Sequence, residues 1–109
     1  MTKLTLPGPI AAYFQIDAHA GETITHCFTE HARVRDEGRT HSGHAAIQAW
    51  KLEASTRYSY TSEPIGLEEK DGGYVVTSRV TGNFPGSPVN LQFAFQLERG
   101  KIAFLEITL

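Results

Sequence analysis

The segment ARVRDEGRTHSG, residues 32–43, concentrates ionisable side chains around a glycine. Three of them could do chemistry together: Asp36 as a proton acceptor, Arg39 as an anion-binding cation and His41 as a proton relay near neutral pH. If Asp36 lies at the mouth of an apolar cavity, loss of water around its carboxylate raises its pKa toward a value useful to a general base. An aspartate that accepts the backbone N–H groups of a turn, or that pairs with Arg39, would give the same pattern. The residues leave both interpretations of Asp36 open.

Arg39 and His41 also have structural interpretations. The forked donors of Arg39 could bind a substrate carboxylate or enolate, whereas a salt bridge to Asp36 or Glu37 is the structural alternative. His41 could relay a proton with Asp36, or it could stabilise the start of the helix that follows. No second constraint in the sequence selects the chemical role for either residue.

The five histidines raise the question of a metal site. His26 and His31 are five residues apart, and His41 and His44 are three apart, so neither pair forms the helical His-Glu-x-x-His pattern of a zinc site. Cys27 is the only cysteine and lies on an apolar helical face. We therefore expect no metal ligands, polar surface histidines and a buried thiol.

The elements that must position this segment begin with two helices and a strand. Apolar residues recur at three- and four-residue spacings between a proline suited to a first helical turn and a glycine suited to a left-handed stop, which predicts a helix over Pro9–Ala20. Thr23 can cap a shorter helix that runs through Phe28. The period-two alternation of Ala32–Asp36 predicts a short strand with Asp36 at its end.

A third helix is predicted directly after the charged segment. Ser42 or Gly43 can cap its start. Lys51 and Glu53 are expected to point away from its apolar face. That face would carry Ala46, Ile47, Trp50 and Ala54.

The second half of the chain is rich in β-branched and aromatic residues separated by turn signals. It predicts four strands, over Arg57–Glu68, Tyr74–Asn83, Val89–Glu98 and Lys101–Leu109. The third of these strands, Val89–Glu98, shows the clearest alternation of apolar and polar residues. Its core face would carry Leu91, Phe93, Phe95 and Leu97, and its other face Asn90, Gln92, Ala94 and Gln96.

Composition limits the class of protein. A chain of 109 residues is most simply one domain, residues 1–109, around one core. A formal charge of −2 leaves no basic excess, so nucleic acid is not expected as a partner. No apolar run approaches the ~20 residues of a membrane span, and no signal pattern opens the chain, so we expect no membrane partner and a cytoplasmic location.

Helices grouped first and an antiparallel meander grouped last predict an α+β fold. Three helices from the N-terminal half would cover the concave face of a curved mixed or antiparallel sheet. Such a sheet would close a cone-shaped cavity.

This order of elements resembles the SnoaL-like branch of the nuclear transport factor 2-like superfamily over nearly the whole chain. The motifs that carry the resemblance are VRDEGRTHxG, residues 34–43, and AIxxW, residues 46–50. The superfamily holds polyketide cyclases, ketosteroid isomerases, epoxide hydrolases, dehydratases and non-enzymes, so the resemblance implies a fold more firmly than a function.

Ketosteroid isomerase allows a comparison residue by residue. Asp36 falls where that family keeps its general base, at the end of the first strand. The position of the family's oxyanion-binding tyrosine corresponds to Phe14, with Tyr13 one residue off, and the position of its second oxyanion-binding acid corresponds to Phe93. Of these three groups of ketosteroid isomerase, the resemblance therefore implies only the general base, at Asp36.

Two functions follow as hypotheses. In the first, Asp36 takes a proton from a small apolar carbonyl compound, and Arg39 or His41 stabilises the charge, in a cofactor-independent cyclase- or isomerase-type lyase reaction. In the second, the chain is a non-catalytic ligand-binding or dimerisation module whose cone is filled by its own side chains. A pocket with Asp36 on its wall would favour the first. The residues expected to contact the ligand are Tyr13, Phe14, Trp50, Tyr58, Phe93 and Leu105.

A homodimer is expected through the outer face of the sheet, because two-fold pairing is the commonest way to cover such a face and because the superfamily does so. Arg79 would lie at this dimer contact. An inward position, as an anion anchor, is the alternative for Arg79.

Overall fold

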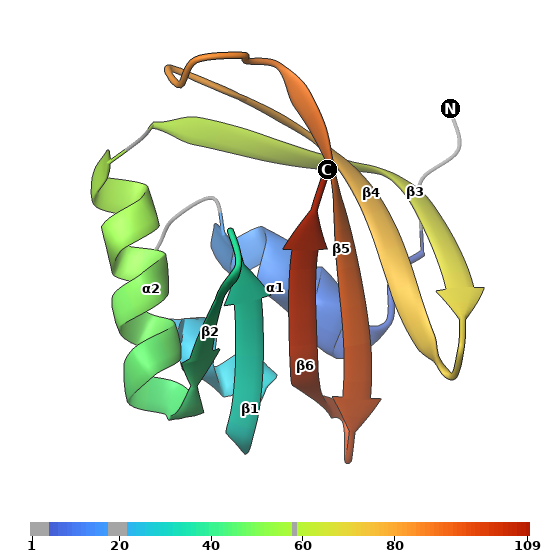
Figure 1. Ribbon diagram of the computed structural model, residues 1–109. Coiled ribbons are helices and arrows are strands. Elements are labelled where there is room, and N and C mark those ends of the chain that lie inside the picture. Colours follow the sequence, from blue (N-terminus) through green and yellow to red (C-terminus); the bar gives the residue numbers. More distant parts are fainter. Residues whose placement is uncertain (1–4, 18–21, 58) are drawn as a thin grey trace.

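The computed structural model describes residues 5–17, 22–57 and 59–109 (Figure 1). Helices come first and a meander of strands last, which confirms the α+β class. None of the described helices combines the length and apolarity needed to cross a membrane. The elements in chain order are α1 (Gly8–Asp17), the 3₁₀ helix η1 (Glu22–Cys27), β1 (Phe28–Asp36), β2 (Arg39–Ser42), α2 (Gly43–Arg57), β3 (Tyr60–Lys70), β4 (Gly73–Gly82), β5 (Val89–Glu98) and β6 (Lys101–Thr108).

The strands form one six-stranded mixed sheet in the order β2-β1-β6-β5-β4-β3. Strands β1 and β6 run parallel, and the other neighbouring pairs are antiparallel. The parallel register sets Asp36 beside Ile107. The end of β1 therefore lies next to the end of β6, near the middle of the sheet.

Tight turns of one kind connect three antiparallel strand pairs. Glu37-Gly38, Asp71-Gly72 and Arg99-Gly100 each place both residues at positive φ, between 52° and 78°. This is the type I′ conformation, whose twist matches that of the flanking strands. The first turn pairs Asp36 with Arg39, so β1 ends directly at Asp36. Strand β2 was not predicted, because its mostly exposed residues show no apolar alternation.

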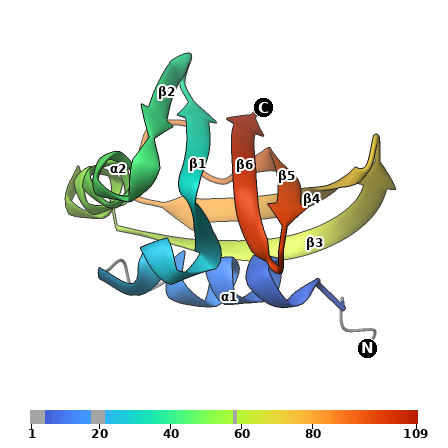
Figure 2. The ribbon, with the colours of Figure 1, turned by 90° about the horizontal axis from the view of Figure 1, so that it is seen from below.

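The core lies between the sheet and the helices. Figure 2 shows α1 running along one face of the sheet, while α2 lies beside the edge formed by β1 and β2. At the centre, Phe93 is 4% exposed and Phe95 is 1% exposed, and Leu91 and Leu97 pack partly buried against the core. This confirms the inward face predicted from the alternation in Val89–Glu98.

Two features of the predicted architecture are wrong. The described part of the chain has two α-helices, because residues 22–27 form a 3₁₀ helix that continues directly into β1, and the strand starts at Phe28 rather than Ala32. The sheet stays open, with β2 and β3 at its edges, and is not curled strongly enough to make a cone. The predicted end of the first helix at Ala20 lies outside the described residues.

Candidate active site

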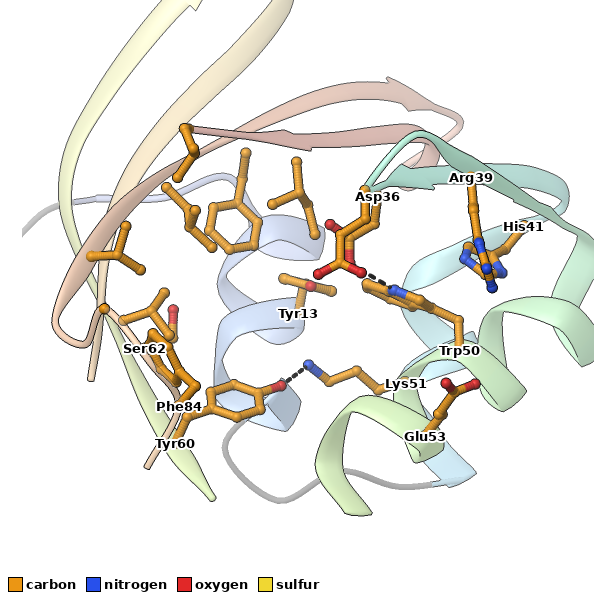
Figure 3. Close-up of a pocket in the computed structure, with 18 of the residues that line it drawn as sticks. Tyr13, Asp36, Arg39, His41, Trp50, Lys51, Glu53, Tyr60, Ser62 and Phe84 are labelled. Carbon is orange, nitrogen blue, oxygen red and sulfur yellow. Dashed lines mark hydrogen bonds between the residues drawn. The ribbon is translucent and has the colours of Figure 1, made fainter. Parts of the chain in front are cut away.

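A pocket of about 770 Å³ opens at the end of the sheet where β1 and β6 finish and where β3 and β5 begin (Figure 3). Helix α2, the β1–β2 hairpin and the loop between β4 and β5 complete its walls. Strands β4, β5 and β6 contribute apolar side chains, whereas ionisable ones come from the helices, the hairpin and β3. A pocket of this volume and mixed lining can hold a small organic molecule.

Asp36 lies on the pocket wall, half-buried at the last position of β1. Its Oδ2 accepts a hydrogen bond from Nε1 of Trp50 on α2 at 3.0 Å. Burial raises the pKa of the Asp36 carboxyl above its ordinary value, against the lowering effect of the Trp50 hydrogen bond. The charge of Glu37 raises the pKa further, whereas His41 and a hydrogen bond from the backbone of Glu37 lower it. The carboxylate is therefore a stronger proton acceptor than a free aspartate.

Arg39 does not form an ion pair with Asp36 or Glu37 in the described structure. Its side chain is exposed at the pocket mouth. On the surface, Arg35 forms an ion pair with Glu106 at 3.5 Å. The salt bridge that was the structural alternative for Arg39 is not formed.

His41 stands at the mouth of the pocket, partly exposed, beside Trp50. The two ring centroids are 6.0 Å apart, with an interplanar angle of 34°. A histidine in this position reaches solvent on one side and acts electrostatically on Asp36 on the other.

Lys51 reaches into the same pocket from α2, so the prediction that it points elsewhere is wrong. It is 3% exposed, and its Nζ donates a hydrogen bond to the hydroxyl oxygen of Tyr60 at 2.6 Å. The Nζ also lies 5.2–5.7 Å from the ring centroids of Tyr60, Trp50 and Tyr13, within the range of cation–π contacts. Burial lowers the pKa of Lys51 to about 7. Ammonium and neutral amine therefore coexist near neutral pH.

Tyr13 enters the pocket from α1 and lies between Asp36 and Lys51 in Figure 3. It is 1% exposed, and its ring packs edge-on against Phe28 at 6.1 Å between centroids. Burial raises the pKa of the Tyr13 phenol well above its ordinary value, and the nearby Tyr60 and Asp36 add to the rise. Tyr13 is therefore a permanent hydrogen-bond donor at working pH.

Comparison with solved structures decides the family. A candidate polyketide cyclase from Sinorhizobium meliloti is 36% identical in sequence, with 94% of this chain and 95% of that chain covered and a TM-score of 0.89. The chain belongs to the SnoaL-like branch of the nuclear transport factor 2-like superfamily.

More distant structures share the fold of this SnoaL-like protein. SalBIII, an epoxide hydrolase/cyclase-like enzyme of pyran ring formation in the polyether salinomycin, is 22% identical over 92% of this chain and 86% of that chain, with a TM-score of 0.77. A protein with a ketosteroid isomerase-like fold from Catenulispora acidiphila, in complex with trimethylamine, is 14% identical over 96% of this chain and 87% of that chain, with a TM-score of 0.80. No protein-family model matches the chain, and no curated protein matches its sequence.

Some of the residues expected to contact a ligand do line the pocket of this SnoaL-like protein. They are Tyr13, Trp50 and Phe93. Asp36, Arg39 and His41 line it as well, so one pocket brings together the three residues singled out for chemistry. Tyr58 lies outside the described residues.

Phe14 and Leu105, which were also expected to contact a ligand, do not line this pocket. Phe14 follows Tyr13 on α1 and is turned by about 100° around the helix axis. It packs against Phe93 instead, with 5.1 Å between ring centroids. Leu105 is 0% exposed, in the core, two positions before Ile107, where β6 reaches the pocket. Tyr13 and not Phe14 therefore faces the pocket from α1.

The described histidines outside the pocket, and Cys27, are the residues left to consider as metal ligands. Among the described residues, no three His, Cys, Asp or Glu side chains gather as metal ligands would. His44 Nε2 lies 3.1 Å from the carbonyl oxygen of Phe28. Cys27 is buried, and burial raises the pKa of its thiol, as expected for an unreactive cysteine.

Proposed function

We propose that this SnoaL-like protein is an enzyme that removes a proton alpha to the carbonyl group of a small, largely apolar compound, with Asp36 as the base. The environment of Asp36 carries the proposal. Its carboxylate lies half-buried on a pocket wall, is oriented by Trp50, and has a pKa raised by burial. Carboxylates perturbed in this way, in a pocket, are typical of catalytic sites.

Removal of the proton leaves a negative charge on the substrate oxygen, and hydrogen-bond donors must stabilise that charge. Tyr13 supplies a phenol that stays protonated beside Asp36. His41 passes the abstracted proton to solvent at the mouth, and Arg39 adds positive potential there. Cyclisation and isomerisation of carbonyl compounds can both begin with this step, and side chains alone can supply the base and the donors.

The second candidate is a ligand-binding or dimerisation module without catalysis. That function requires no base and is compatible with an interior filled by side chains. The pocket of about 770 Å³ favours a bound ligand over a filled interior, and the position of Asp36 on its wall favours chemistry.

Proton abstraction can be measured without the natural substrate. Apolar ketones such as 2-indanone and 2-tetralone exchange their alpha hydrogens for deuterium in heavy water, which proton NMR follows. We expect the protein to accelerate this exchange, and Asp36→Asn to reduce the acceleration by about 10²–10⁴-fold.

Asp71→Asn is the matched control, because it makes the same chemical change in the exposed turn between β3 and β4. It should exchange at the wild-type rate. Equal rates in wild type and Asp36→Asn would rule out Asp36 as the base. Binding of these ketones without any exchange would favour the non-catalytic module.

We also propose that the chain acts as one domain and as a cytoplasmic homodimer. The outer sheet face exposes Gln92, Gln96 and Arg79, and the exposure of Arg79 supports a place at the dimer contact over an inward anion anchor. A two-fold pair would cover that face. A single buried cysteine suits a reducing compartment. Light scattering at micromolar concentration should report twice the mass of the chain, and the mass of a monomer would contradict the dimer.

A further inference from the structure

We infer that Lys51 is a covalent binding group of the pocket, whose amine condenses with an aldehyde or ketone to form an imine. The inference rests on the proposed function for the class of ligand, and it deepens that function by giving the carbonyl compound a second anchor. Imine formation itself does not need Asp36. The two proposals can therefore fail separately.

The position of the amine is the first support. The side chain of Lys51 runs from α2 into the pocket and ends beside Tyr60, with three aromatic rings around it (Figure 3). A lysine with a purely packing role usually extends its charged end to water. Here the amine faces inward, toward the space that a ligand would occupy.

The protonation state is the second support. Only the neutral amine has the lone pair that attacks a carbonyl carbon. Burial lowers the pKa of Lys51 to about 7, so about half of the molecules carry a neutral amine at neutral pH. The titratable groups around it are Tyr13 from α1, Tyr60 from β3, Asp36 on the wall formed by β1, and Glu53, exposed on the same helix.

The step balances without an oxidant or reductant. The lone pair of Nζ forms a bond to the carbonyl carbon, the π electrons of the carbonyl move to its oxygen, and a proton passes from nitrogen to that oxygen. A second proton then lets the oxygen leave as water, and the nitrogen lone pair forms the C=N bond of the protonated imine. The hydroxyl of Tyr60, 2.6 Å from Nζ, is placed to transfer these protons.

The imine would assist the base across the pocket. A protonated imine withdraws electrons from its neighbouring carbon more strongly than a carbonyl does, so the alpha hydrogen becomes more acidic. Asp36 and Lys51 lie on different walls of one pocket, with Tyr13 between them. A ligand anchored on Lys51 would present its alpha carbon to the part of the pocket between Lys51 and Asp36.

Reductive trapping tests the inference. The full chain is incubated at pH 7 with 2-naphthaldehyde and sodium cyanoborohydride, whose hydride converts an imine into a stable secondary amine. Peptide mapping by mass spectrometry then locates the label among the four lysines. We expect Lys51 to be labelled about 10³-fold faster than the exposed Lys70, because an ordinary lysine is almost fully protonated at this pH and Lys51 is about half neutral.

Variants separate the alternatives. Lys51→Met should reduce the label to the level of the surface lysines, whereas Lys70→Met should keep it. Asp36→Asn should still be labelled at Lys51, even where it has lost alpha-hydrogen exchange. Label spread over lysines in proportion to exposure, or a Lys51 that stays unlabelled in the wild-type chain, would overturn the inference. The mapping in the wild-type chain does not depend on whether Lys51→Met folds.

Discussion

The indole N–H of Trp50 donates to Oδ2 of Asp36 at 3.0 Å, and this bond joins helix α2 to the end of β1. Trp50 is 9% exposed, so the bond lies where the core meets the pocket. A hydrogen bond to a charged carboxylate stabilises the charge, and Trp50 therefore limits the rise in pKa that burial causes. The pair controls both the direction and the basicity of the carboxylate.

Trp50→Phe keeps an aromatic ring and removes the donor. We expect the pKa of Asp36 to rise further, because burial would then act with less opposition. Loss of a hydrogen bond to a charged group should also lower the free energy of unfolding by about 1.5–3 kcal/mol. Carbon-13 NMR titration of the aspartate carboxyls and urea unfolding measure the two effects. An unchanged or lower pKa would show that Trp50 does not tune Asp36.

Asp36→Asn should be at least as stable as wild type at neutral pH. Burial raises the pKa of Asp36 in the folded state, so the folded state holds this proton more tightly than the unfolded state. Protonation of Asp36 therefore stabilises the folded state fully at pH values below the unfolded pKa, and this stabilisation is lost as pH rises through the folded pKa. The advantage of the asparagine variant should therefore vanish toward pH 3. Large destabilisation at pH 7 would instead mean that the Asp36 carboxylate holds the hairpin together.

Lys51 should make the stability of the wild-type chain increase with pH. Its pKa is lowered to about 7 in the folded state from 10.5, so between these values the unfolded state binds more protons. Stability should then rise by up to about 1.4 kcal/mol per pH unit across this window. Urea unfolding at pH 7, 8 and 9 should show the rise in wild type and in Lys70→Met, and a flatter profile in Lys51→Met. Parallel profiles in all three chains would contradict a buried, perturbed Lys51.

Gly73→Ala tests the pairing of β4 with β5, which carries apolar pocket residues. Gly73 is buried, and a Cβ there would collide with the carbonyl oxygen of Phe95. Because backbone atoms must shift, we expect a loss of about 1–3 kcal/mol in the free energy of unfolding. Gly8→Ala is the control, since a Cβ at Gly8 meets nothing within 4 Å. Equal stabilities of the two variants would mean that β4 does not approach β5 so closely.

Local pattern was enough to predict much of the scaffold. The alternation in Val89–Glu98 predicted which face of β5 is buried, because a side-chain period of two leaves a strand only two faces. The strand pattern before Gly38 placed Asp36 at a strand end, and the helical period placed Trp50 on a buried face. These features depend on neighbours within a few residues.

Tertiary structure decides which side chains line the pocket. Tyr13 and Phe14 are adjacent and both buried, so only the rotation of α1 against the sheet decides which one faces the pocket. Lys51 follows Trp50, and a charged residue at that place normally indicates a solvent-facing position. It is buried because Tyr60, at the start of β3, and Tyr13, from the distant helix α1, pack around its amine. Strand β2 likewise exists through its pairing with β1, since its own residues carry no strand pattern. The sequence thus determined the scaffold and the position of Asp36. The packing of α1, α2 and β3 around the end of the sheet decided which side chains face Asp36. Tertiary structure was needed for this because the side chains that bury and charge the pocket come from separate segments of the chain.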